Sequence, residues 1–252
     1  MIPEHKAAIE TLKTALTQID ARLAATRTRA RAELIRERHE IMGRLHPNYA
    51  YASQAGQDVV VDRILKQKRG GVFVDVGAYD GIMGSNSLFF EQQRGWSGVL
   101  VEPMPTFFEK AKSARKSPCL NCAVGPQTGT AEFIAVSQGY TQMSGLLDHY
   151  DPKLLERVRQ DPRHEENVIT VQMRTLSDII AATGTDHPDF VSLDIEGGEL
   201  AVLESFPFDR HRVAIWAIEN NSGGSDIRKI MTANGYNLVE FCGPDEIYHK
   251  PN

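Results

Sequence analysis

Cysteine is scarce in this 252-residue chain, and three copies are too few for a disulfide framework. Cys119 and Cys122 form a C-x-x-C pair, but no second pair of cysteines or histidines follows at the spacing of a zinc site. Cys242 stands alone near the C-terminal end. We therefore interpret all three as reduced, buried thiols.

The chain also lacks an apolar run of about eighteen residues, so no transmembrane helix is expected. Its first ten residues, MIPEHKAAIE, contain acidic groups and no apolar stretch, which is unlike a secretory signal. We therefore expect a cytoplasmic protein. A net charge of -5 shows no excess of positive charge, so we expect no nucleic-acid partner.

Residues 4–42 lack both glycine and proline, unlike the rest of the chain. In the first half of this segment apolar residues recur every three or four positions, which is the seam of a coiled coil. They are Ile9, Leu12, Leu16, Ile19 and Leu23. The second half is rich in arginine with interleaved glutamate, and the sequence His46-Pro47-Asn48 ends the helical pattern.

This pattern predicts a long amphipathic helix or a helical hairpin, packed on its own domain or on a second copy of the chain. The alternative is a basic face for an acidic partner or a membrane surface. We expect residues 1–48 to form an N-terminal helix that joins copies into a homo-oligomer, most simply a dimer.

From residue 49 to 252, short apolar strands alternate with helical segments, which is typical of a doubly wound parallel sheet. The predicted strands are 72–77, 98–102, 119–124, 189–194, 213–219, 236–241 and 245–249. The predicted helices are 57–67, 85–94, 105–115, 175–183, 197–205 and 224–234. A further pair of strands, 130–136 and 168–173, brackets residues 137–167, which have weak periodicity and many turn formers. We expect 137–167 to be an insertion that acts as a lid.

The predicted strand at 72–77 leads directly into Gly77-Ala-Tyr-Asp-Gly81. A strand, a glycine turn and a helix in this order place a ligand at the carboxyl edge of the sheet. A dinucleotide-binding fold has the spacing G-x-G-x-x-G, which Gly77 and Gly81 do not match. Asp75, inside the strand, suits the ammonium and sulfonium cations of S-adenosylmethionine better than a pyrophosphate. A nicotinamide-dependent oxidoreductase is therefore the disfavoured alternative.

The next predicted strand ends in Glu102, whose carboxylate can accept hydrogen bonds from both hydroxyls of an adenosine ribose. The alternative is a solvated residue at a strand end. Its position at the end of the neighbouring strand favours the ribose role.

Several segments resemble those of the FkbM-type methyltransferases, and they occur in the family's order. They are SQAGQD (53–58), FVDVGAYDG (73–81) followed by Ser85-Asn86, GWSGVLVEP (95–103), CAVG (122–125), SLDIEGGEL (192–200) and IEN (218–220). The resemblance covers about residues 50–250 and leaves out the N-terminal helix. It implies a class I methyltransferase fold, Rossmann-like with a seven-stranded doubly wound sheet, behind an N-terminal helical or coiled-coil extension.

The resemblance further implies S-adenosylmethionine as the methyl donor, and O-methylation of a sugar, glycan or secondary metabolite. The acceptor is then a small molecule or a glycan. The cofactor contacts implied by the matching motifs are Gln54, Gln57, Asp75, Gly77, Ala78, Asp80, Gly81, Ser85, Asn86, Glu102 and Asp194.

Two further strand ends offer groups that can take a proton from an acceptor hydroxyl. Asp194 ends one predicted strand, and Glu219 and Asn220 end the next. Three oxygen ligands on adjacent strand tips suit Mg²⁺ or another divalent cation, which would acidify a bound hydroxyl. Without a metal, a carboxylate or a histidine is the base, either His249 in the last strand or His149 or His164 in the lid.

A non-enzymatic alternative is a coiled-coil assembly module that carries an inactive methyltransferase domain. A degenerate domain is expected to lose its carboxylates first. Asp75, Glu102, Asp194 and Glu219 are all present, which favours an enzyme.

Overall fold

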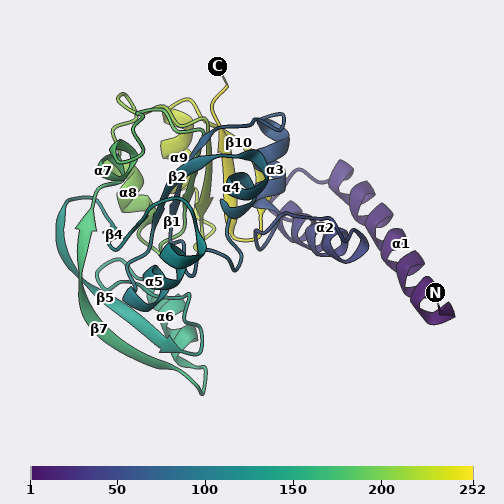
Figure 1. Ribbon diagram of the computed structural model, residues 1–252, viewed down its shortest axis with the longest axis horizontal. Helices are drawn as coiled ribbons and strands as arrows, with labels where there is room; N and C mark the ends of the chain where they lie inside the picture. The colour runs from purple at the N-terminus through teal and green to yellow at the C-terminus, as the bar shows by residue number, and fades with distance from the viewer. Residues whose placement is uncertain (1, 252) are drawn as a thin grey trace.

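The computed structural model describes residues 2–251, and a seven-stranded sheet forms its centre (Figure 1). In spatial order the strands are β10 (Asn237–Cys242), β11 (Asp245–His249), β9 (Ile215–Glu219), β8 (Phe190–Leu193), β1 (Val72–Val76), β2 (Ser97–Val101) and β3 (Cys119–Leu120). β11 runs antiparallel to both of its neighbours, and the other pairs are parallel. The predicted class I methyltransferase fold is therefore confirmed.

Side chains of the central strands alternate between two buried faces. On β1, Val74 and Val76 belong to one hydrophobic core and Phe73 to the other. This alternation lets helices cover both faces of the sheet. One face packs against α7 (Leu176–Ala181), α8 (Glu199–Ser205) and α9 (Asp226–Ala233), and the other against α3 (Gln57–Ile64) and α4 (Leu88–Arg94). α5 (Pro105–Ala114) lies against β3 at the edge.

The predicted strand at 119–124 is in fact two short strands in two different sheets. The amide of Asn121 donates to the carbonyls of Glu102 and Pro103, which holds the chain in a turn between them. β4 (Ala123–Val124) therefore joins a second sheet, with the order β4, β7 (Glu165–Arg174), β5 (Gly129–Gln138) and β6 (Gly145–Leu146). Cys122 and Cys242 are buried as expected, whereas Cys119 is only half-buried.

Segment 137–167 is more regular than the sequence indicates. β5 and β7 pair along their full length and extend into it, and it also contains β6 and α6 (Pro152–Arg159). Asp151 caps α6 by accepting hydrogen bonds from the N–H groups of Lys153 and Leu154. The sequence shows only weak periodicity here because these elements are too short to give a clear period.

The N-terminal segment forms two helices, α1 (Pro3–Ala25) and α2 (Arg31–Leu45). Arg31 donates to the carbonyls of Leu23 and Thr26 at the end of α1, and its guanidinium pairs with Glu240 of β10 at 2.6 Å. α2 therefore packs on the chain's own sheet, while α1 extends away from the body (Figure 1). No helix within residues 2–251 has both the length and the apolar character needed to cross a membrane.

Candidate active site

A cavity of about 590 Å³ lies at the carboxyl ends of β1, β2, β8 and β9. Most of the side chains that the sequence singles out line it, from segments far apart in the chain. These are Gln54, Gln57, Asp75, Gly77, Ala78, Ser85, Asn86, Glu102, Asp194 and Glu219. Parallel strands have their carboxyl ends at the same edge of a sheet, so residues at the ends of different strands meet there in the fold.

Gly77 is required by the close approach of two strand ends. Its φ is +82°, and a Cβ at this position would lie 1.9 Å from the carbonyl oxygen of Asp194. The N–H groups of Gly77 and Ala78 both donate to the carbonyl of Val101, at 3.1 and 3.0 Å. The turn therefore holds β1, β2 and β8 together at the base of the cavity.

Asp75 is buried at the end of β1 and holds the loop that follows it. Its carboxylate accepts hydrogen bonds from the hydroxyls of Ser85 and Ser87, and Arg115 donates to both hydroxyls. Burial raises the pKa of Asp75, and the Ser87 hydrogen bond and the Arg115 charge oppose that shift. Because residues 85–87 form this loop, α4 begins at Leu88, later than the predicted helix at 85–94.

Glu102 is held rigidly at the end of β2. Its two carboxylate oxygens accept hydrogen bonds from the N–H groups of Tyr79 and Met104, both at 2.8 Å. Burial raises the pKa of Glu102 to about 7, and these two hydrogen bonds oppose the shift. The Tyr79 and Phe107 rings lie 4.1 Å apart, and both residues line the cavity beside this carboxylate.

A cluster of carboxylates forms the other side of the cavity. Single oxygens of Asp194, Glu196 and Glu219 all lie within 4.8 Å of one another. Burial and then the charge of Asp245 raise the pKa of Asp194 to about 8, and burial and then Asp194 raise that of Glu196 to about 9. One oxygen of Glu219 is buried without a hydrogen-bond partner among the described residues. The cluster is therefore short of positive charge, and it suits a cation.

Two residues predicted for the chemistry lie elsewhere. The Asn220 amide group donates to the Gly224 carbonyl and to Glu246, and accepts from Ser222, outside the cavity lining. Asn220 follows Glu219 directly in the chain, so its side chain leaves on the opposite side. Glu196, two residues after Asp194, takes the place expected for Asn220.

The prediction for His249 was also wrong, because the last strand runs antiparallel. β11 pairs Asp245 with Glu219 and His249 with Ile215, which places His249 at the far end of the sheet. Asp245, at the beginning of the strand, reaches the cavity instead. No histidine within residues 2–251 lines it.

Asp80 and Gly81, predicted as cofactor contacts, belong to the turn behind the cavity. Asp80 accepts hydrogen bonds from the N–H groups of Ile82 and Met83, and a Cβ on Gly81 would lie 2.9 Å from the Arg115 side chain. Gln57 lines the cavity and donates to Asp245 at 3.0 Å. Asp80 and Gly81 therefore shape the loop and do not line the cavity.

The sequence reasoning missed several lining residues. Ser192 and Asp245 are buried in strands, and Glu196 lies in the turn after β8 at a positive φ of 61°. Segment 137–167 adds a wall made of residues 141–144, Leu146 of β6 and Arg157 of α6. The motif SLDIEGGEL contains Ser192 and Glu196, so it could have indicated both. An antiparallel last strand begins, rather than ends, at the edge of the sheet where the cavity lies, and this direction could have indicated Asp245.

Comparison with known proteins gives one family. The model of the methyltransferase FkbM domain matches residues 75–238. Among solved structures, the methyltransferase FkbM from Methylobacillus flagellatus is 16% identical with a TM-score of 0.49, and the match covers 96% of this chain and 60% of that one. A TehB-like SAM-dependent methyltransferase from Corynebacterium glutamicum is 12% identical with a TM-score of 0.39, covering 89% of this chain and 100% of that one.

A precorrin-6y C5,15-methyltransferase from Geobacter metallireducens is also 12% identical, with a TM-score of 0.40, over 76% of this chain and 85% of that one. No curated protein matches. This chain thus spans 60% of the length of the Methylobacillus protein, and α1 and α2 precede the segment that the family model matches. That segment is well over half of the chain, and the protein therefore belongs to the FkbM methyltransferase domain family.

Proposed function

We propose that this protein is an S-adenosylmethionine-dependent O-methyltransferase that acts on a hydroxyl of a sugar, a glycan or a secondary metabolite. The observation that carries the proposal is the single cavity that joins Glu102 at one end to the carboxylate cluster at the other. The donor is a cation, and an alcohol acceptor must lose a proton. A carboxylate-lined cavity serves both needs.

Glu102 is the residue that we assign to the ribose. Both of its oxygens are fixed by backbone N–H groups, so each presents its remaining lone pair in a defined direction. Tyr79, Met104 and Phe107 line the same part of the cavity and supply an apolar surface for an adenine ring. The donor contacts are then Gln54, Gln57, Asp75, Gly77, Ala78, Ser85, Asn86, Glu102 and Asp194.

The carboxylate cluster is the place for the acceptor hydroxyl. S-adenosylmethionine supplies a methyl group already activated by its sulfonium. Without a metal, Asp194, whose pKa of about 8 lies near neutral pH, is the base that takes the hydroxyl proton in its ionised form. The rigid β8 and β9 ends hold Asp194 and Glu219 in place, which fixes the direction from which an acceptor approaches.

The same cluster fits a divalent cation. Three carboxylates with mutually close oxygens, one of them unpartnered, are the hard donors that Mg²⁺ or a similar ion prefers. Asp194, Glu196 and Glu219 would hold it, and the ion would lower the pKa of an acceptor hydroxyl.

The acceptor side of the cavity is formed by elements outside the central sheet. Met143, Ser144 and Arg157 come from segment 137–167, and Arg36 and Glu40 come from α2. We propose that this segment closes over the acceptor as a lid. Tyr140 is 45% exposed, and Tyr150 is buried with its hydroxyl on the Met143 carbonyl, so neither is part of this wall.

The decisive experiment is ligand binding followed by turnover. S-adenosylhomocysteine should raise the melting temperature of the full chain, and NAD should not. With a pool of hydroxylated acceptors, Asp194→Asn should lower transfer of the labelled methyl group by about 10²–10⁴-fold. Full turnover by Asp194→Asn would rule out its role as base, and full turnover after exhaustive chelation would rule out the metal.

We also propose that α1 joins copies of the chain into a homo-oligomer, with residues 1–48 as the assembly element. The apolar stripe of α1 is buried only at Ile19 and Leu23, where it meets α2, and the rest extends beyond the body (Figure 1). Leu12→Glu with Leu16→Glu should therefore shift the full chain to a monomer in sedimentation. An unchanged mass would remove this role from α1.

A further inference from the structure

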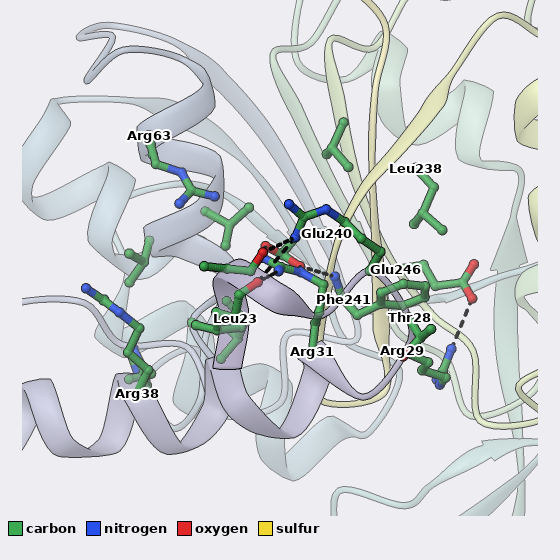
Figure 2. A pocket seen from close by; sticks show the side chains of 18 of the residues that line it. Leu23, Thr28, Arg29, Arg31, Arg38, Arg63, Leu238, Glu240, Phe241 and Glu246 are labelled. Carbon is green, nitrogen blue, oxygen red and sulfur yellow. Dashed lines mark hydrogen bonds and ion pairs between the residues drawn. The ribbon is translucent and has the colours of Figure 1, made fainter. Parts of the chain in front are cut away.

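A second cavity, larger than the first, lies beside the N-terminal helices at the edge of the sheet, where α2 packs on β10 (Figure 2). Its volume is about 1230 Å³, and α1, α2, α3, α9 and β10 all contribute to its walls. None of the residues that line the candidate active site belongs to it. It is therefore a separate cavity, and the proposed methyl transfer does not use it.

Arginine dominates the charge of this cavity. Six arginines line it, against three carboxylates, in a chain whose net charge is -5. The arginines are Arg27, Arg29, Arg31, Arg38, Arg63 and Arg228, and the carboxylates are Asp20, Glu240 and Glu246. The second cavity thus carries the charge opposite to that of the candidate active site.

Each carboxylate of this cavity already has a cationic partner. Glu240 pairs with Arg31 through two hydrogen bonds of 2.6 Å, and Glu246 pairs with Arg29 at 3.0 Å (Figure 2). Asp20 accepts from Arg38 at 2.8 Å. The negative charge of the lining is therefore neutralised by arginines that also fasten α1 and α2 in place.

Three arginines remain without a carboxylate. Arg27 donates only to the main-chain carbonyls at the end of α1. Arg63 of α3 and Arg228 of α9 have no hydrogen-bond or ion-pair partner in residues 2–251, and Figure 2 shows Arg63 apart from the ion pairs. A guanidinium offers five N–H donors in a planar fork that fits phosphate and carboxylate oxygens.

We propose that this cavity binds a small organic molecule with two or more phosphate or carboxylate groups. Arg63 of α3 and Arg228 of α9 offer their guanidinium groups to the anionic groups of the ligand, and Arg27 adds further positive charge. Ile35, Val60 and Phe241 line the same space and pack against the organic part. The volume exceeds the range of about 300–1,000 Å³ that holds most small ligands, so a ligand of the size of a nucleoside diphosphate or an acidic oligosaccharide fits.

The test is a titration of the full chain with inorganic pyrophosphate as the phosphate probe and citrate as the carboxylate probe. We expect saturable one-to-one binding of at least one probe, and the stronger of the two identifies the class of anion. Binding should weaken by tenfold or more in the double variant Arg63→Ala with Arg228→Ala. The double variant Arg22→Ala with Lys116→Ala removes the same charge from exposed positions outside the cavity, and it should bind as the parent does.

Saturating S-adenosylhomocysteine should leave the affinity for the probe unchanged, because the two cavities share no residue. The proposal is overturned if neither probe saturates, if both double variants lose affinity equally, or if S-adenosylhomocysteine displaces the probe. Binding to duplex DNA or to anionic vesicles, without binding to either probe, would assign the arginines to a macromolecular surface and also overturn it. Arg63→Gln with Arg228→Gln repeats the test if the alanine variant is unstable.

Discussion

The two cavities of this protein differ in charge although the same strand ends contribute to both. Asp245 faces the candidate active site, whereas the next residue, Glu246, faces the second cavity and pairs with Arg29 in the link between α1 and α2. Successive side chains of a strand point to opposite faces, so one step along β11 separates the two environments. The charge differs because the carboxylates are paired differently. Asp194, Glu196 and Glu219 cluster in the active site without a cationic partner in the described part of the chain, whereas Glu240 and Glu246 in the second cavity are each paired with an arginine.

We expect the largest difference between the two cavities from Glu102→Ala, which should weaken ligand binding in the active site alone. Loss of hydrogen bonds between a carboxylate and the ribose hydroxyls should weaken S-adenosylhomocysteine binding by about 10–100-fold in calorimetry. Pyrophosphate affinity should not change. Equal loss of both ligands would mean that the variant is unfolded, and an unchanged Kd for S-adenosylhomocysteine would remove Glu102 from the ribose site.

A second contrast is the dependence on pH. The pKa of Glu102 is raised to about 7, so this carboxyl group is neutral below pH 7 and ionised above it. An ionised group is the better acceptor for hydroxyl donors, and S-adenosylhomocysteine affinity should rise several-fold between pH 6 and pH 8. Arginine stays charged throughout, so once His39, the histidine that lines the second cavity, is replaced by Gln, a methanedisulfonate probe there should bind equally at both values. Persistence of the rise in Glu102→Ala would assign it to another group.

A third prediction separates the two proposed sets of metal ligands. Glu196→Gln should weaken Mn²⁺ binding by roughly tenfold, because it removes one of three close carboxylates. Asn220→Ala should change the Mn²⁺ affinity less than twofold, since the Asn220 amide contacts Glu246 and Ser222 instead. The reverse order of effects would restore Asp194, Glu219 and Asn220 as the ligands.

The last prediction concerns the stability of the ligand-free protein. Burial raises the pKa of Asp245 to about 6, above its ordinary value, so this residue favours the folded state below pH 4 and loses that contribution as the pH rises through 6. Asp245→Asn removes the buried charge and should stabilise the chelated protein at pH 8 by about 1–2 kcal/mol, or roughly 2–8 °C in melting temperature. At pH 4 the two proteins should melt together, and a variant less stable at pH 8 would contradict the prediction.

The sheet was predictable because its strands are apolar and separated by helical periods. The prediction for 245–249 agrees residue for residue with β11, and most other boundaries differ by one to three residues. The site residues on parallel strands were predictable for the same reason, since Asp75, Glu102, Asp194 and Glu219 each lie within one residue of the carboxyl end of a strand. The regular structure in 137–167 was not, because β6 has two residues and α6 has eight.

Hydrophobic periodicity and the order of elements along the chain were enough to predict the class of fold and the edge at which carboxylates gather, and the resemblance of short motifs was enough to predict the family. Each of these signals is carried by residues close together in the chain. The packing of distant elements was needed to place Asp245 rather than His249 in the cavity, to put Glu196 in the place of Asn220, and to gather the arginines of α2 and of the link before it with Arg63 and Arg228 around a second cavity. These outcomes depend on the direction of one strand and on contacts between residues about two hundred positions apart. No local pattern encodes such contacts, because they arise only when distant elements pack.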